Sequence, residues 1–175
     1  GPSPKDAKFT PTDGLVIFQF DYDVLNLQNG LIYLYDDSGD VWKSINYYGG
    51  SREGMSLPQE EFRPFDFRAG DFWLKLRLTG RSADWLEVVV KEDVSPKLRK
   101  YIRSDDRLFQ TLTWQRYVLE MINLDFDINE NPVLESPGGR AKDIGVKENL
   151  GYVPIRIQGD WLQIGYVKDT GDGVR

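Results

Sequence analysis

Short apolar runs and alternating apolar and polar positions recur along the chain. Alternation gives a β-strand one buried face and one exposed face. Turn-forming residues separate the runs, and short strands joined by frequent turns are typical of small antiparallel barrels. The pattern therefore predicts an all-β chain, with strands at residues 15–20, 31–35, 74–78, 86–90, 153–157 and 162–164.

One segment has a helical period instead. Its apolar residues are spaced at i, i+3, i+4, i+7 and i+8, which places them on one helix face. Thr113 can cap this helix, because its hydroxyl oxygen can accept an early backbone N–H. We expect residues 105–123 to form a turn and a short amphipathic helix that clamps the two halves of the chain together. The mostly buried face would consist of Trp114, Tyr117, Val118, Met121 and Ile122.

Two parts of the chain carry similar residues in the same order. Residues 33–45 and 132–144 each contain an apolar pair, an acid, a glycine turn and Lys-x-Ile. Each block is followed by a second one that opens with Asp-Trp. These second blocks are Asp84-Trp85-Leu86-Glu87-Val88 and Asp160-Trp161-Leu162-Gln163-Ile164.

This order of blocks resembles the bacterial SH3 (SH3b-like) family, in which a Gly-Trp-x-x-Val block follows a loop and a hairpin. The Asp-Trp blocks take the place of Gly-Trp here, and Lys100-Tyr101-Ile102 resembles the closing strand of the first copy. The resemblance implies two divergent copies, built as two small SH3-like barrels joined by a short α-helix. Such modules hold cell-wall peptides or protein segments.

The resemblance also implies a domain plan. Residues 8–104 form the first barrel, with an extra N-terminal strand and an inserted loop at 46–71. Residues 105–123 form the linker, and residues 124–175 form a second barrel that lacks its last strand.

Composition excludes several kinds of chemistry. The 175 residues include no Cys and no His, which excludes disulfides, thiolate nucleophiles, His-ligated zinc and a Ser-His-Asp triad. The net charge of −6 predicts no nucleic-acid partner. No apolar run approaches the roughly 18 residues of a membrane span.

Carboxylates are the remaining candidates for catalysis or metal binding. Neighbours in sequence are not evidence for the two separated carboxylates that a glycosidase needs. Residues 125–131 have the spacing that begins an EF-hand loop, but Glu130 and Ser136 replace its required Gly and Glu. We therefore predict no catalytic residue, no metal and no cofactor. The pairs considered are Asp21/Asp23, Asp36/Asp37, Glu60/Glu61, Asp105/Asp106 and Asp125/Asp127.

Aromatic residues are the candidate ligand-binding groups. Trp85 and Trp161 each lie one position before an apolar residue of the same strand, so their side chains point to the opposite face of that strand. Their rings therefore either form a stacking platform for a ligand or cover a barrel end. In the insert, we expect Tyr47, Tyr48 and the tip at 49–54 to be exposed, so that Tyr47, Tyr48 and Arg52 could be presented to a protein partner.

The aromatics later in the same insert have another predicted role. We expect Phe65, Phe67 and Phe72 to pack back on the first barrel.

The sequence thus predicts a non-catalytic binding or interaction protein of a bacterial cell envelope, which recognises a protein or a cell-wall peptide. A carbohydrate-binding or carbohydrate-acting protein is the alternative, using exposed aromatics and carboxylates. The chain begins Gly1-Pro2-Ser3, which is typical of a protease scar or of a chain whose signal peptide has been removed. We accordingly expect a periplasmic or extracellular location.

Overall fold

The computed structural model describes residues 1–47, 60–68, 71–141 and 150–168. It confirms a mostly β protein. The chain divides into two compact units, Gly1–Trp114 and Gln115–Arg175, which are described separately below. Within the described residues, no helix is long and apolar enough to cross a membrane.

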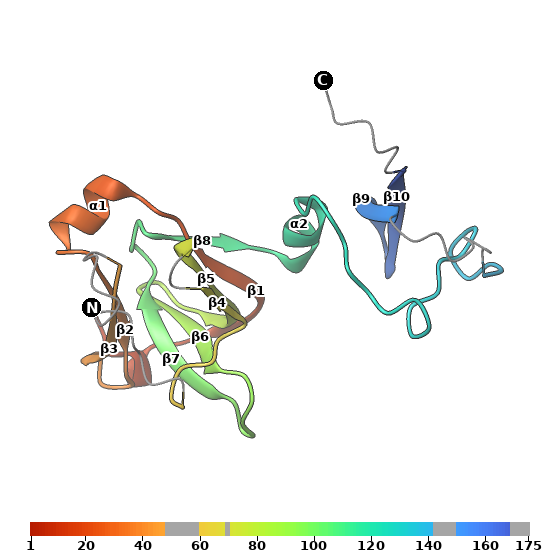
Figure 1. The fold of residues 1–175 in the computed structure, drawn as a ribbon. Coiled ribbons are helices and arrows are strands. Elements are labelled where there is room, and N and C mark those ends of the chain that lie inside the picture. The colour runs from red at the N-terminus through yellow and green to blue at the C-terminus, as the bar shows by residue number, and fades with distance from the viewer. Residues whose placement is uncertain (48–59, 69–70, 142–149, 169–175) are drawn as a thin grey trace. The chain divides into compact units, whose positions relative to one another are not determined.

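The first unit is built around one antiparallel sheet with the strand order β3-β2-β7-β6-β5-β1-β8, and β4 also pairs with β5 (Figure 1). A short 3-10 helix, η1 (Pro4–Asp6), precedes the sheet, and helix α1 (Tyr22–Leu27) follows β1. The strands are β1 (Thr10–Phe18), β2 (Leu31–Tyr35), β3 (Val41–Asn46), β4 (Asp66–Arg68), β5 (Trp73–Arg81), β6 (Trp85–Lys91), β7 (Leu98–Arg103) and β8 (Phe109–Leu112).

Strands that are far apart in the strand order of the sheet contribute to one hydrophobic core. Ile45 of β3, Val88 of β6 and Val16 of β1 belong to the same buried cluster, so the sheet curls around it. Val24 of α1 joins the cluster, and the Asp21 carboxylate caps α1 by accepting from the backbone N–H groups of residues 23 and 24. The all-β prediction is confirmed, whereas SH3-like barrel identity stays a prediction.

The described part of the insert returns to the sheet. Phe62 is buried and Phe67 packs against the core, which confirms the prediction for Phe67. Phe65 and Phe72 also pack on the first unit, although they stay 38% and 41% exposed: Phe65 meets the Trp114 ring edge-on at 5.3 Å between centroids, and Phe72 stacks on Tyr47 at 5.5 Å. Phe72 has a left-handed backbone, with φ 53°.

The expected exposure of Tyr47 is wrong. Only 6% of Tyr47 is exposed, because its ring stacks on Phe18 at a centroid distance of 4.8 Å inside the core. Tyr48, Arg52 and the tip at 49–54 lie outside the described residues.

The predicted linker at 105–123 needs two corrections. Its first half supplies β8, which pairs with β1 and places Leu112 in a buried position. Its helix, α2 (Trp114–Leu119), is shorter than predicted and has no fully buried residue. Because α2 ends at Leu119, Ile122 lies beyond the helical face and is 92% exposed.

The second unit contains a two-stranded antiparallel sheet, formed by β9 (Leu150–Gln158) and β10 (Trp161–Lys168). Tyr152 of β9 forms a bridge to Leu124 and packs on Phe126 at 5.2 Å between ring centroids. Over the described side chains of this unit, none is fully buried. The described part therefore forms a hairpin, and the predicted second barrel is not confirmed there.

Candidate functional site

We call four residues of the first unit the Trp85 site: Tyr35, Gly39, Trp85 and Arg103. Tyr35, Arg103 and Trp85 lie on the neighbouring strands β2, β7 and β6, and Gly39 lies in the turn after β2. Trp85 and Arg103 are directly opposite in the β6–β7 register. The Arg103 guanidinium lies 4.8 Å from the Trp85 ring centroid, within the range of a cation–π interaction. The Tyr35 ring meets Trp85 edge-on, with 5.3 Å between centroids. The sheet itself therefore holds the walls of this site.

The turn between β2 and β3 completes the site. One Asp36 carboxylate oxygen accepts from the backbone N–H groups of Ser38 and Asp40 at 2.9 and 3.1 Å, and from the Ser38 hydroxyl at 2.6 Å. The Ser38 hydroxyl bond is the main reason why the pKa of Asp36 is lowered from its usual value. Gly39 has a left-handed φ of 89°, and a Cβ there would lie 3.7 Å from the Trp85 ring. The turn is thus anchored, and it brings bare backbone close to the tryptophan.

The N-terminal segment, residues 1–6, occupies the Trp85 site. The Trp85 indole N–H donates to the Pro2 carbonyl oxygen at 2.8 Å, and the Lys5 backbone N–H donates to the Asp37 carbonyl oxygen at 3.0 Å. Pro4 is buried beside Gly39. Ser3 has φ −67° and ψ 158°, close to polyproline II geometry. The segment that lies against the tryptophan is therefore extended at Ser3 and enters the 3-10 helix η1 at Pro4.

Burial also affects the ionisable groups around the site. It raises the pKa of Tyr35, and Asp106 raises it further. It likewise raises the pKa of Tyr101, to which the Asp37 and Glu87 charges add. Both phenols are therefore neutral at neutral pH. The site presents uncharged rings, one guanidinium and an aspartate-rich turn.

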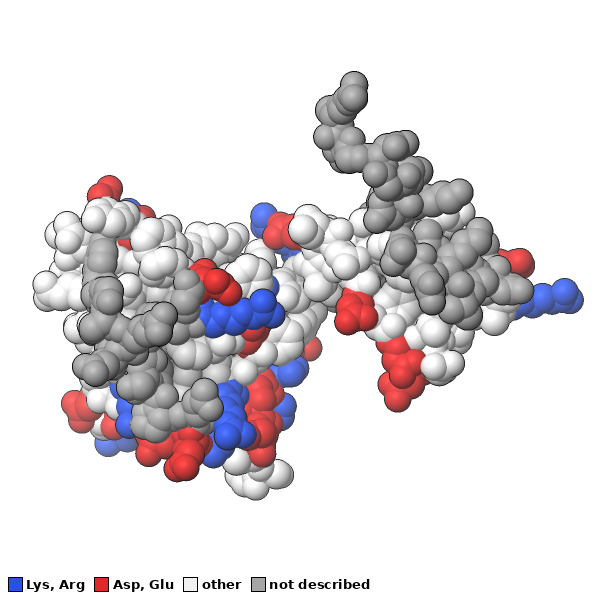
Figure 2. All heavy atoms as spheres, viewed as in Figure 1, with Lys and Arg blue, Asp and Glu red and all other residues white. Residues whose placement is uncertain are grey.

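Charges of both signs are mixed on the first unit. On the face shown in Figure 2, basic and acidic side chains are interspersed. Glu92 illustrates this: burial alone would raise its pKa, but hydrogen bonds from Lys97 and Arg77 outweigh burial and lower it. On the described part of this face, neither sign of charge dominates as it would on a surface for a nucleic-acid backbone.

The structure does not bring the predicted ligand-binding residues together. Trp85 is only 4% exposed, because residues 1–6 cover it. Trp161 is 44% exposed and belongs to the other unit. Tyr47 lies in the core, where burial raises its pKa. The sequence analysis missed Pro4, Tyr35 and Arg103, which reach Trp85 through pairing between distant segments.

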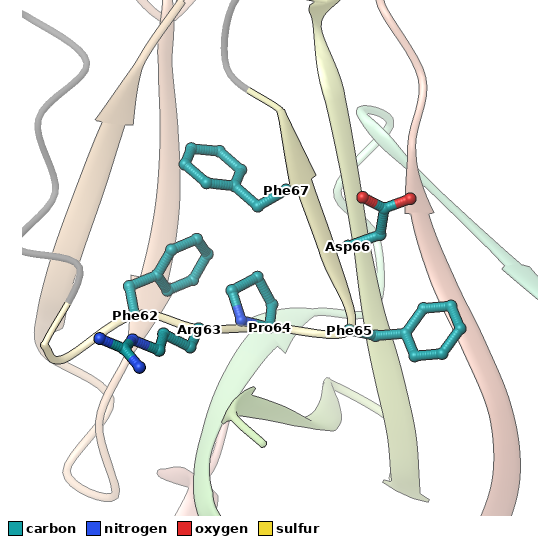
Figure 3. A pocket seen from close by; sticks show the side chains of 6 residues that line it. All are labelled: Phe62, Arg63, Pro64, Phe65, Asp66 and Phe67. Atoms are coloured by element: carbon teal, nitrogen blue, oxygen red, sulfur yellow. The ribbon is translucent and has the colours of Figure 1, made fainter. Parts of the chain in front are cut away.

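A shallow pocket of about 350 Å³ lies along the described part of the insert (Figure 3). Phe62 and Phe67 are on one side of the segment, and Phe65 points away from them. Polar groups there already have protein partners: Arg63 pairs with Asp93 at 2.7 Å, and Asp66 accepts from the Trp73 indole at 2.6 Å. We therefore assign this segment a structural role. The pocket is lined by Phe62, Arg63, Pro64, Phe65, Asp66 and Phe67.

A second aromatic surface, the α1 ring group, consists of Phe20, Tyr22 and Phe72. These residues are 48%, 63% and 41% exposed. The Phe20 ring lies 4.6 Å from Phe72 and 6.4 Å from Tyr22. Asp21 and Asp71 are their neighbours in sequence.

Within the described residues, no group of His, Cys, Asp or Glu is arranged to hold a metal ion. Comparison with known proteins adds no assignment: no family model, curated protein or solved structure matches this chain.

Proposed function

We propose that this chain is a non-catalytic binding protein that recognises an extended segment of another protein at the Trp85 site. The observation that carries this proposal is the docking of residues 1–6 on Trp85. The site already holds a peptide, through one indole bond to a carbonyl and one backbone bond to Asp37.

The contacts suit a peptide better than a small metabolite. Both hydrogen bonds involve the bound segment's backbone, which every peptide offers, and the buried contact comes from the Pro4 ring. Aromatic surfaces that hold proline-containing segments are a recurring mode of peptide recognition.

The groups at the site also favour binding over catalysis. The Asp36 carboxylate is already engaged by Ser38 and Asp40, and the Arg103 guanidinium stacks on Trp85. The proposed partner is a protein or a cell-wall peptide. A bacterial envelope location is part of this proposal only through the sequence resemblance to the bacterial SH3 family.

Selection of random extended peptides tests the function without assuming a ligand sequence. The bait is the full chain with Pro4→Asp, which removes the buried ring and adds a charge beside the aspartate-rich turn. We expect selected peptides to bind this bait and to lose at least tenfold in affinity when Arg103→Ala is added. Arg99→Ala is the matched control, because Arg99 lies on the same strand and pairs with Glu87 instead. Failure to select any peptide, or equal loss with both arginine variants, would refute the proposal.

The α1 ring group supports carbohydrate binding as a second candidate. Sugar rings have apolar faces that can cover exposed aromatic rings, and their hydroxyls can donate to neighbouring carboxylates such as Asp21 and Asp71. A glycan array probed with the full chain tests this candidate. Binding should disappear with Phe20→Ala and persist with Phe65→Ala, an exposed phenylalanine outside the group. An array without any bound glycan would eliminate the candidate.

A further inference from the structure

We infer that Tyr47 is a specificity-determining residue of the α1 ring group, and that its buried hydroxyl bonds a hydroxyl of a bound sugar once the Phe72 ring moves aside. The inference rests on the second candidate function, carbohydrate binding at the α1 ring group, and adds the residue that selects the ligand. It is carried by an unpartnered polar group that lies behind one ring of an exposed aromatic surface.

Within the part of the chain that the structure describes, the Tyr47 hydroxyl is buried and has no hydrogen-bond partner. Only 6% of the residue is exposed. Burial raises the pKa of Tyr47, so its hydroxyl is protonated at neutral pH and can donate as well as accept. A buried hydroxyl without a partner lowers stability, and phenylalanine would fill the same space without that cost. The hydroxyl has a role if a ligand supplies its partner.

Stacked rings connect this hydroxyl to the surface. Tyr47 stacks on Phe18 of the core and on Phe72 of the α1 ring group, with 4.8 and 5.5 Å between centroids and interplanar angles of 25° and 27°. The Phe72 ring lies 4.6 Å from Phe20, which lies 6.4 Å from Tyr22. Phe72 therefore covers Tyr47 on the side of the exposed rings.

The backbone of Phe72 stores strain that movement of the residue can release. Its φ of 53° lies in the left-handed region, which is costly for a bulky side chain and is found mainly at functional sites. Phe72 comes one residue before β5, so its ring can turn without changing the pairing of that strand. The ring is 41% exposed and thus has room to move towards solvent.

A sugar suits this combination better than an apolar ligand does. Phe20 and Tyr22 are 48% and 63% exposed, and the C–H face of a pyranose can pack on such rings. An acyl chain could cover the same rings, but it would leave the Tyr47 hydroxyl without a partner. A sugar offers both the apolar face and hydroxyls at its edge.

Gln28 supplies a second group of the same kind. Its Oε1 atom is buried and, among the described residues, also has no hydrogen-bond partner. Gln28 is the C-cap residue of α1, and two residues later the Gly30 carbonyl oxygen accepts from the Tyr47 backbone N–H at 2.8 Å. The two unpartnered groups thus lie on neighbouring segments. A sugar hydroxyl both donates and accepts, so it can bond an amide oxygen and a phenol alike.

Calorimetric titration of the full chain tests the inference with three neutral β-linked probes: cellohexaose, xylohexaose and chitohexaose. We expect at least one probe to bind, and Tyr47→Phe to weaken this binding at least tenfold. The melting temperature of Tyr47→Phe should equal or exceed that of the unmodified chain, because the variant removes an unpartnered hydroxyl. Tyr33→Phe is the matched control, since it removes a hydroxyl from β2 of the same unit and should leave the affinity unchanged.

The role of Phe72 as a cover is tested separately. Phe72→Gly removes the covering ring and relieves the left-handed backbone, so it should bind the same probe at least threefold more tightly. Weaker binding would show that Phe72 is a contact surface and would overturn its role as a cover.

The outcomes separate this inference from the candidate function. Equal binding by Tyr47→Phe would show that the sugar contacts the rings alone, so carbohydrate binding would stand and the inference would be wrong. A lower melting temperature of Tyr47→Phe would show that the hydroxyl is already bonded in the free protein, which also overturns the inference. If none of the three probes binds, the inference fails, and a glycan array without any bound glycan eliminates the candidate function as well.

Discussion

The hairpins β5–β6 and β9–β10 can be compared position by position. Leu76-Arg77-Leu78 and Ile155-Arg156-Ile157 lie on the first strands, and Trp85 and Trp161 open the second strands. Trp85 is 4% exposed, whereas Trp161 is 44% exposed. Leu76 is fully buried, whereas Ile155 is 53% exposed.

The difference comes from what surrounds each hairpin. In the first unit β7 pairs with β6 and β1 pairs with β5, so the hairpin is the centre of a curled sheet. In the described part of the second unit, β9 and β10 pair with each other, and a two-stranded sheet alone is marginally stable. Similar local sequence thus forms a similar hairpin, while neighbouring strands determine which side chains are buried and which groups gather around Trp85.

The largest expected difference concerns the two tryptophans. Trp85→Ala should destabilise the first unit by about 3–5 kcal/mol, because it opens a cavity where Tyr35, Arg103 and residues 1–6 meet. Trp161→Ala should cost less than about 1 kcal/mol, because much of that ring is already in water. Urea unfolding followed separately by the amide resonances of β6 and β10 measures both values. Equal costs would contradict the comparison.

Arg77 and Arg156, which occupy the same position in the two hairpins, should differ less in their contribution to the free energy of unfolding. Arg77 donates to Glu92 at 3.0 Å, and its guanidinium lies 5.3 Å from the Trp114 ring centroid. We expect Arg77→Ala to cost about 1–2 kcal/mol. Arg156→Ala removes one exposed bond to Gln163 and should cost less than about 0.5 kcal/mol. The same urea experiment applies, and a larger cost for Arg156→Ala would reverse the proposed ranking.

Two glycines with left-handed backbone, Gly39 and Gly138, lie in the turns that precede the two hairpins in sequence, and alanine substitution there extends the comparison. Gly39 and Gly138 have φ of 89° and 70°, so alanine at either position should cost about 1 kcal/mol. A Cβ at Gly138 would meet nothing within 4 Å, whereas one at Gly39 approaches Pro4 and Trp85. Gly39→Ala should therefore also shift the Trp85 indole resonance, and Gly138→Ala should not. An unchanged Trp85 indole resonance in Gly39→Ala would contradict the claim that this turn is part of the Trp85 site.

The smallest effect is a local pH dependence. The pKa of Asp36 is lowered from 3.8, chiefly by the Ser38 hydroxyl bond, so its ionised form favours the folded turn. This contribution is present above the unfolded pKa and is lost as pH falls through the lower, folded pKa. The Ser38 amide resonance should therefore titrate with a midpoint below 3.8, and Asp36→Asn should remove this titration. A midpoint above 3.8 would show that the turn is not anchored as described.

Sequence reasoning succeeded where interactions are local. Alternating residues predicted the strands at 74–78 and 86–90, although neither strand has a wholly exposed second face, since Lys75 and Val89 are buried as well. It failed where distant segments meet: β8 was assigned to a linker, and Tyr47 was expected to be exposed. The contact of Pro4 with the Trp85 site depends on strand pairing and turn geometry together, so no local pattern could reveal it.

The most direct test of the account asks where a bound peptide lies. An isotope-filtered NOE experiment would combine the labelled Pro4→Asp chain with the unlabelled hexapeptide Gly-Pro-Ser-Pro-Lys-Asp-amide. We expect contacts from the second proline of the peptide to Gly39, beside which Pro4 lies in the unmodified chain, and from the first proline to the Trp85 indole, which bonds the Pro2 carbonyl oxygen there. Contacts to Phe20 and Phe72 instead, or to Trp161, would contradict the central claim that the Trp85 site binds an extended proline segment.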